Sequence, residues 1–396
     1  MFDLASSLSA VTDSRERPQI STKVVAQSVL AMFLCRLGSL NSIEQLKGSK
    51  SLREFLDAPL PSADSLGRIL DLVDSDSIRT VIHQMYDRAK RSKMLQSPSH
   101  GLVALIIDGH ESHATYLRHC EGCLERKKDK GGKETTQYYH RNVTAQLVFA
   151  GVCFLLDAES QIPGEGELPC AMRLLERVLC QYPKAFQVVV MDALYAKSTF
   201  FNKIIEHNKH AIAVLKDQRR ELFKAAEDIF NDQVPQSFEL RGTKIDCWDA
   251  SDLRSWTQVK KPVRVIRTHE IPAPIVRQLS RESEEQPASR WTWVTTLSAE
   301  HASSRDVIEL AHSRWSIENE GFNELVNHWH ADHVYKHAPA AFINFWLMSM
   351  LAYNLFRAFF LRNLRPAVRR GKTMLHFARL LTAQLFVTCA VNGVPP

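Results

Sequence analysis

Two aspartates that directly follow apolar runs are the first residues that suggest chemistry. Asp108 ends the run Ala-Leu-Ile-Ile-Asp, and Asp192 ends the run Val-Val-Val-Met-Asp. Each run is typical of a strand, and groups just past strand ends line the functional crevice of open α/β sheets. Carboxylate oxygens are ligands that Mg²⁺ and Mn²⁺ prefer. The pair therefore predicts a divalent-metal site, and the alternative is that each Asp is an ordinary turn or cap residue.

A third carboxylate is expected from a helix closer to the C-terminus. The segment 313–329 has a helical pattern in which Arg314 and Glu318 lie four residues apart and share one face. Glu320 and Glu324 are expected to point elsewhere on this helix. The alternative for Arg314 and Glu318 is an ordinary surface ion pair, which contributes little to stability.

The order of the predicted elements places these residues in a mixed fold. Residues 21–95 predict several short helices, and residues 102–215 predict the order β-β-β-α-β-α-β. Residues 237–296 predict short strands on either side of a polar, mobile loop at 277–290. Three helices are expected after them, over 303–310, 313–329 and 340–361.

In its residues and their order, the chain resembles the DDE transposases of bacterial insertion sequences, and among them the IS-four-like group. The motifs that carry the resemblance are Asp108, Asp192, Glu318 and the segments Cys120–Arg126, Tyr138–Arg141 and Asp192–Tyr195. The resemblance implies an α/β (α+β mixed) fold: a ribonuclease-H-like core with a helical N-terminal domain and a β-rich insertion before the last catalytic helix. The expected parts are a helical DNA-binding or dimerisation region at 1–98, the first part of the core at 99–215, the insertion at 216–296, the final core helices at 297–362 and a basic tail at 363–396.

The C-terminal signature of that group, Tyr-x2-Arg-x3-Glu-x6-Lys, is half kept. Arg314 and Glu318 match it, whereas Ala311 stands at the Tyr position and Leu325 at the Lys position. Contacts that the Tyr and Lys make to DNA phosphate in the group are therefore in doubt here. Two alternatives to an active transposase stay open: a catalytically inactive, domesticated relative that binds DNA, and a metal-dependent nuclease on the same core.

The resemblance also implies a mechanism. Asp108, Asp192 and Glu318 would hold Mg²⁺ or Mn²⁺, with two ions about 4 Å apart as in other phosphoryl-transfer sites. Arg314 would steady Glu318 or contact a phosphate. The reaction would cleave double-stranded DNA at the element ends and join those ends to target DNA. Bringing two ends together predicts a homodimer.

The positive charge is concentrated near the C-terminus. The net charge is +6, and no acidic residue follows Asp332. A segment of single-sign charge suits a polyanion such as nucleic acid, and the alternative is a solvated helix surface. The cations expected to bind DNA are Arg314, Arg365, Arg369, Arg370 and Lys372.

Cys120 and Cys123 have the spacing of zinc ligands. The companions considered for them are His110, His113, His119 and His140. The alternative is two reduced cysteines in a turn. His330, His333 and His337 are predicted to share one helical face, where phosphate contact or plain packing is favoured over a metal. The segment 126–133, basic and with two adjacent glycines, is predicted to be an exposed flexible loop.

Other features bear on the compartment and the core. The N-terminal residues lack a cationic start followed by an apolar run, so no secretory signal is expected. The apolar run 341–361 contains Asn344, Asn354 and Arg357, which favours a buried core helix over a membrane span. No membrane partner is expected, and the expected location is the cytoplasm, at the nucleoid when the protein is bound to DNA. Trp248 and Trp256 are expected to pack in the core, with base stacking as the alternative.

Overall fold

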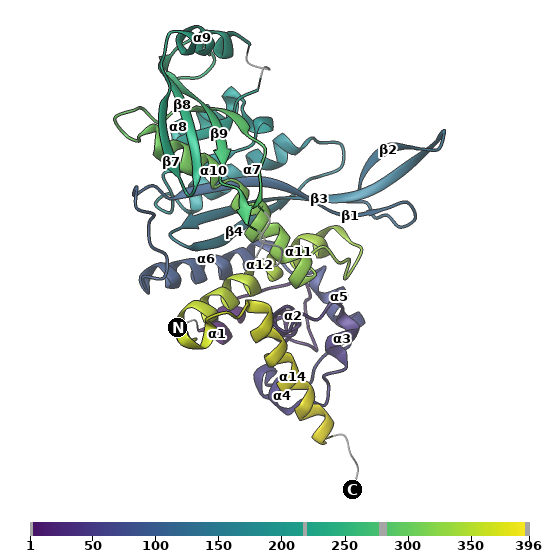
Figure 1. Ribbon diagram of the computed structural model, residues 1–396. Helices are drawn as coiled ribbons and strands as arrows, with labels where there is room; N and C mark the ends of the chain where they lie inside the picture. Colours follow the sequence, from purple (N-terminus) through teal and green to yellow (C-terminus); the bar gives the residue numbers. More distant parts are fainter. Residues whose placement is uncertain (1–2, 217–219, 277–282, 393–396) are drawn as a thin grey trace. The chain divides into compact units, whose positions relative to one another are not determined.

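The computed structural model describes residues 3–216, 220–276 and 283–392, and the chain divides into two compact units (Figure 1). Unit 1 comprises Met1–Gln96, Gly109–Leu174 and Ser316–Pro396, and unit 2 comprises Ser97–Asp108 and Leu175–Trp315. Strand β1 (Ala104–Thr115) and helix α7 (Glu167–Gln181) each contribute residues to both units.

The N-terminal part of unit 1 is helical, as predicted. Its helices are α1 (Leu4–Leu8), α2 (Thr22–Leu34), α3 (Leu40–Glu44), α4 (Lys50–Leu56), α5 (Ala63–Leu70) and α6 (Ser75–Arg91). A serine precedes each of α2, α3, α4 and α5, and its side chain accepts a hydrogen bond from a backbone N–H of the first turn. Serine is a favoured N-cap residue for this reason, so these helices begin where the sequence provides the cap.

The strands of unit 1 pair in antiparallel fashion. Strand β2 (Leu124–Lys130) pairs with β3 (Lys133–Phe149), and β3 pairs with β4 (Val152–Ser160). The predicted hairpin between β3 and β4 is confirmed. Gly151 has φ +69 there, a left-handed conformation that a side chain would disfavour.

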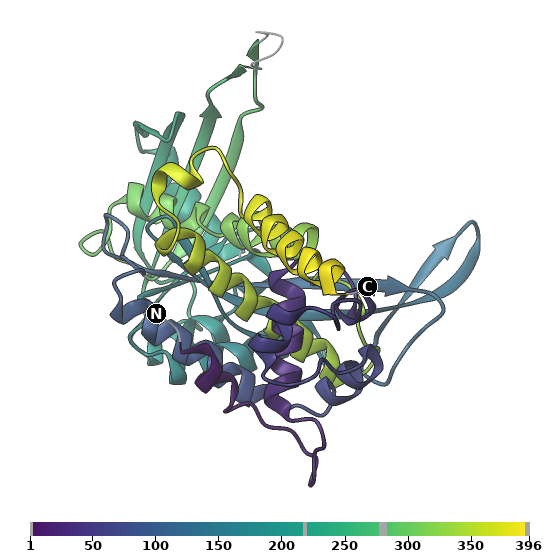
Figure 2. The same cartoon turned by 90° about the horizontal axis from the view of Figure 1, so that it is seen from below.

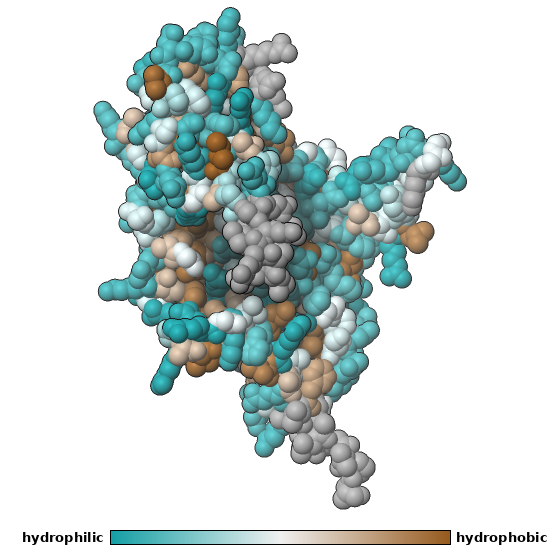
Figure 3. Space-filling view, in the orientation of Figure 1, coloured by the Kyte–Doolittle hydropathy of each residue, from teal (hydrophilic) through white to brown (hydrophobic). Residues whose placement is uncertain are grey.

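The prediction of a flexible loop at 126–133 is wrong, because most of this segment forms β2. The β2–β3 ribbon turns at Gly131 and Gly132, which both have positive φ. Polar side chains hold it: Arg126 Nε donates to Gln137 Oε1 at 2.8 Å, and Lys127 pairs with Glu134. Its surface is strongly hydrophilic (Figure 3). The apolar alternation that normally indicates a strand is absent, so the sequence resembled a loop.

Helix α12 (Pro339–Arg362) is the central helix of unit 1. It is long and apolar enough to cross a membrane, but 78% of its most apolar stretch is buried inside the protein. It packs against α2, α6 and β4 (Figure 2). The prediction of a buried core helix is therefore confirmed.

Two buried asparagines of α12 make hydrogen bonds that fix the position of this helix in the core. Asn344 Nδ2 donates to the carbonyl oxygens of Leu70 and Val73, both at 2.8 Å. Asn354 Nδ2 donates to Leu155 O at 2.7 Å, and its Oδ1 accepts from Leu155 N at 3.0 Å. Both asparagines are almost completely buried, so these bonds replace the water that each amide loses.

Unit 2 contains a mixed sheet. The first part of β1 lies parallel to β5 (Val188–Met191), and β5 lies parallel to β6 (His210–Val214). Strand β12 (Ser289–Thr295) pairs antiparallel with β6 and with β9 (Val263–Pro272). The sheet continues through β8 (Thr243–Leu253) to β7 (Gln236–Leu240). The predicted order β-β-β-α-β-α-β is confirmed except for the additional strand β2, and the β-rich insertion extends this sheet.

The helices of unit 2 are α8 (Ser198–Glu206), α9 (Arg220–Asn231) and α10 (Ser304–His312). The predicted mobile loop at 277–290 is only partly described, since residues 277–282 lie outside the described residues. Ser283–Glu284 forms β11 and pairs with β10 (Ile275–Val276), and β12 already begins at Ser289. Trp256 is buried against Phe201, with ring centroids 4.9 Å apart, which agrees with its predicted place in the core.

Asn354→Leu is expected to lower the free energy of unfolding by about 2–4 kcal/mol. The substitution leaves the buried N–H and C=O of Leu155 without partners, and each such group carries a desolvation penalty of about 1–3 kcal/mol. Chemical denaturation of the full chain measures the change. Asn327→Leu, on an exposed part of helix α11 (Asn323–Trp329), is the matched control and should change stability far less. Equal effects of the two substitutions would contradict the role assigned to Asn354.

Candidate active site

Asp108 and Asp192 directly follow the last paired residues of β1 and β5 in unit 2. The prediction that Asp108 ends its strand is wrong, because β1 continues to Thr115, whereas Asp192 does follow the end of β5. The parallel register of β1 and β5 pairs Ile107 with Met191, so the two aspartates follow directly paired positions. Neighbouring strands lie about 4.8 Å apart, which places the carboxylates within reach of a shared ion. Both side chains are half-buried.

The alternative of a cap does not account for Asp192. It occupies the N-cap position of the 3₁₀ helix η1 (Ala193–Tyr195), but its side chain makes no capping hydrogen bond. Among the described residues, the Asp192 carboxylate has no hydrogen-bond or ion-pair partner, because the contacts of this residue are made by its backbone. A carboxylate at a strand end without a capping role is available for a ligand.

Arg314 provides the cation beside these carboxylates. Its Nη1 lies 3.1 Å from Asp108 Oδ2, and the two side chains are only 13% and 17% exposed. The sequence predicted that Arg314 would steady Glu318 or contact a phosphate. The structure places the guanidinium beside Asp108, where it balances part of the negative charge that two adjacent aspartates create. The roles of Arg314 toward Glu318 or a phosphate stay predictions.

The predicted helix over 313–329 is confirmed from Trp315 onward, but it begins two residues later than predicted and contains a π-helical turn. Helix α10 ends at His312, and Ser313 and Arg314 form a turn. Helical structure resumes at Trp315 and includes the π-helical turn η3 (Ile317–Phe322) before α11. Arg314 therefore lies outside the helix, and the face-sharing argument for Arg314 and Glu318 does not apply. π-helical turns are often found at functional sites.

Aromatic side chains of the insertion hold the turn that carries Arg314. The ring of Trp315 lies 4.9 Å from that of Trp291 on β12 and 4.8 Å from that of His312. His312 Nε2 is in turn 2.9 Å from Glu270 Oε1 on β9. The sequence analysis missed His312, Glu270 and Trp291. His312 lies between two predicted helices, so only its residue type could have drawn attention to it.

Glu318 lies in unit 1, near the start of η3, and is exposed. The other two acids of this segment have partners within the unit: Glu320 lies 3.8 Å from Arg357, and Glu324 lies 3.4 Å from Arg36. The structure thus brings together Asp108, Asp192 and Arg314. The place of Glu318 beside the two aspartates stays a prediction.

Gly321 allows η3 to pack closely on β3. A Cβ atom at this position would lie 2.7 Å from Gln146 Oε1, closer than real Cβ contacts allow. The amide of Gln146 is buried, and its Nε2 donates to Ser316 Oγ at 3.0 Å. Gln146 therefore connects β3 to the helical segment that carries Glu318.

The cations of the basic tail lie on an exposed surface. The segment contains the short helix α13 (Pro366–Arg369) and α14 (Met374–Asn392). Arg365, Arg370 and Lys372 are exposed and Arg369 is half-buried. Within the described part of the chain, none of these four forms an ion pair with an acid.

The acidic residues after β3 are structural. Asp157 was expected in a solvated loop, but it lies on β4, is 1% exposed and accepts from Arg79 Nε at 2.9 Å. Glu159 and Glu165 pair with Arg173 at 3.1 and 2.7 Å. These carboxylates neutralise buried or half-buried arginines.

The cysteine pair has partners that only the fold reveals. Cys120 and Cys123 lie together with His140, as considered, and with His337, which was not. His110 and His119 instead stack on Trp346 and Tyr138. His330, His333 and His337 do not share a helical face, because α11 ends at Trp329.

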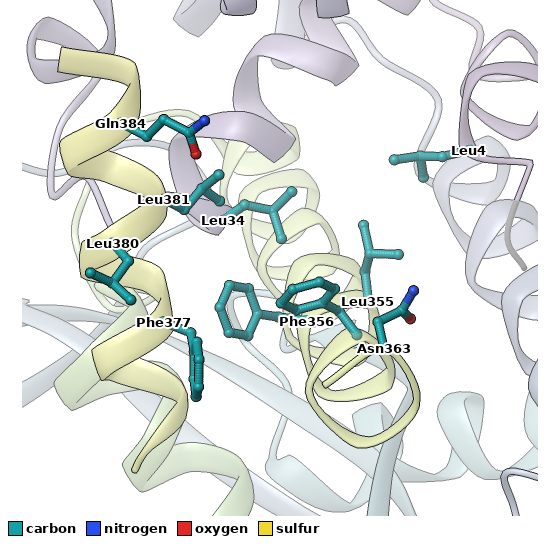
Figure 4. Close-up of a pocket in the computed structure, with 10 residues that line it drawn as sticks. Leu4, Leu34, Leu355, Phe356, Asn363, Phe377, Leu380, Leu381 and Gln384 are labelled. Carbon is teal, nitrogen blue, oxygen red and sulfur yellow. The ribbon is translucent and has the colours of Figure 1, made fainter. Parts of the chain in front are cut away.

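Unit 1 also contains an apolar pocket, whose lining includes none of the candidate metal ligands. It has a volume of about 550 Å³ and lies between α1, α2, α12 and α14 (Figure 4). Its lining includes Leu34, Phe356, Phe377 and Leu381 and contains no charged residue. Such a lining offers nothing for the binding of a phosphodiester or a metal ion.

Gly321→Ala is expected to lower the free energy of unfolding by about 1–3 kcal/mol, as overpacking of a tight contact does. The new methyl group would push Gln146 away from Ser316. Gln146→Ala removes the obstacle, so the double variant should be less destabilised than the sum of the two single variants. Chemical denaturation of the four proteins measures this coupling. Additive effects would show that Gly321 and Gln146 do not press on each other.

A comparison with known protein families found a family that matches most of the chain. The family described as Transposase DDE domain matches residues 99–355, which is more than half of the 396 residues. A comparison with curated proteins found no match. The matched part includes both aspartates, Arg314 and Glu318, in the order that the sequence resemblance implied. The chain therefore belongs to the Transposase DDE domain family.

Proposed function

We propose that this protein is an insertion-sequence transposase of the IS-four-like group, which cleaves DNA at the element ends and joins those ends to target DNA. The observation that carries the proposal is the parallel register of β1 and β5, whose last pair, Ile107 and Met191, is followed directly by Asp108 and Asp192. The half-buried ion pair between Asp108 and Arg314 supports it. Phosphodiester displacement needs this kind of anionic, oxygen-rich site.

The residues present fit a hard divalent cation. Two carboxylates from adjacent strands offer oxygen ligands, which suits Mg²⁺ or Mn²⁺. Asp108, Asp192 and Glu318 would hold the metal, with two ions expected. Bound there, the metal would activate the attacking oxygen and stabilise the leaving oxygen of the phosphodiester.

Side chains of the protein fix the orientation of the candidate catalytic groups. The ion pair with Arg314 fixes the Asp108 carboxylate in one orientation, and the Trp291–Trp315–His312 cluster fixes Arg314. The attacking group would be water in cleavage and a DNA 3′-hydroxyl in joining, so no nucleophilic side chain is required. The Tyr and Lys of the group's signature are replaced by Ala311 and Leu325, which are both buried and have no polar side-chain atom that could bind a phosphate.

DNA binding is proposed to involve the exposed cations of the tail. Arg365, Arg370 and Lys372 can each displace counterions from the phosphate backbone, which gives salt-sensitive binding without sequence preference. We assign recognition of the ends or dimerisation to the helical region 1–98. A homodimer in the synaptic complex and a cytoplasmic, nucleoid-associated location complete the proposal.

Asp108→Asn, Asp192→Asn and Glu318→Gln should each reduce Mg²⁺-dependent nicking of element-end DNA by at least about 100-fold, because each removes one negative ligand of the metal. DNA binding should change little, since the basic surface is intact. Nicking is measured on labelled end DNA, and binding is measured by gel shift on the same preparations.

Glu320→Gln is the matched control, because it removes a carboxylate two residues from Glu318 and should keep most of the nicking activity. Loss of nicking in Glu320→Gln with retention in Glu318→Gln would contradict the assignment of the third ligand. Nicking absent from the unmodified protein would favour an inactive DNA-binding relative. Nicking of random DNA as efficiently as end DNA would favour a nuclease.

A further inference from the structure

Four side chains in unit 1 converge on a point outside the carboxylate site. They are Cys120 and Cys123 in the loop between β1 and β2, His140 on β3, and His337 in the connection between α11 and α12. One ligand atom from each lies within 4.8 Å of all the others. Cys123 and His140 are each 6% exposed, so this is a built interior site.

The individual distances match the edges of a tetrahedron around zinc. The two sulfurs are 3.8 Å apart, and His140 Nε2 lies 3.5 Å from Cys120 Sγ and 3.3 Å from Cys123 Sγ. His337 Nε2 lies 3.2 Å from Cys123 Sγ. Zinc bonds of about 2.3 Å to sulfur and about 2.0 Å to nitrogen at tetrahedral angles predict edges of about 3.8 Å and about 3.5 Å for these pairs.

The surroundings of the four ligands are also arranged for a metal. The backbone N–H of Cys120 donates to Cys123 Sγ at 3.3 Å, as it would to a thiolate. The His140 ring stacks on Phe342 of α12, which fixes its plane. Gly122 packs so closely on Pro339 that a Cβ there would lie 3.0 Å from the proline ring. The Cys-x2-Cys turn is therefore pressed against the first turn of α12.

We propose that Cys120, Cys123, His140 and His337 bind a structural zinc ion. Two thiolates and two imidazoles form a closed ligand set, which selects zinc over the Mg²⁺ expected at the carboxylates. The ion joins the loop after β1, strand β3 and the start of α12, three segments that are far apart in sequence. Its role is to fix the β2–β3 ribbon and the start of α12, independently of the catalytic metal.

Zinc content of the full chain tests this proposal first. Protein purified without chelators should contain about one zinc ion per chain by elemental analysis. Cys123→Ser and His337→Asn should each lose it. Cys180→Ser removes an exposed cysteine on α7, and His119→Asn removes a histidine of the same loop that stacks on Tyr138 instead. Both controls should keep the zinc.

Cobalt substitution tests the proposed zinc site in the unmodified chain, and so does not depend on whether the ligand variants fold. Co²⁺ bound to the unmodified chain should show the intense visible bands of tetrahedral cobalt and thiolate-to-cobalt charge transfer. Removal of zinc by a chelator should lower the melting temperature, and zinc but not Mg²⁺ should restore it. Less than about a tenth of a zinc ion per chain after growth in zinc-supplemented medium, with no thiolate–cobalt band, would overturn the proposal. Full zinc content in Cys123→Ser would overturn it as well.

Discussion

Two carboxylates that follow the last paired residues of neighbouring strands repel each other, and contacts within unit 2 position the cation that offsets this repulsion. The register of β1 and β5 forces Asp108 and Asp192 together, so a cation has to stand beside them. Arg314 does so from a turn, and the insertion supports that turn: β12 pairs with both β6 and β9 and contributes Trp291. The β-rich insertion therefore stabilises the position of a charge as well as extending the sheet.

The core of unit 1 depends on the position of helix α12. Apolar burial alone would let this helix slide or rotate, but Asn344 and Asn354 permit one position, because only that position satisfies their amides. Asn344 binds carbonyls at the α5–α6 connection, so the N-terminal helices and α12 share one core. Removal of residues 1–98 would therefore expose part of this core.

Much of the fold could be predicted from the sequence, because continuous apolar runs and serine caps are local signals. They predicted the apolar strand segments that precede Asp108 and Asp192 and the helical character of residues 21–95. Strand β2 was missed because residues 126–133 lack the apolar alternation that is typical of a strand. The π-helical turn was missed because it depends on tertiary contacts, such as that of Gly321 with Gln146. His337 lies 214 residues from Cys123, and no spacing rule could connect them.

The most direct test of a three-carboxylate site is iron-mediated cleavage of the protein. Fe²⁺ occupies Mg²⁺ sites, and in the presence of peroxide and ascorbate it cuts the nearby backbone. The site proposed here predicts cuts close to Asp108, Asp192 and Glu318, all suppressed by excess Mg²⁺ and all lost in Asp108→Asn. Cuts near the two aspartates with none near Glu318 would contradict the assignment of Glu318 as the third ligand.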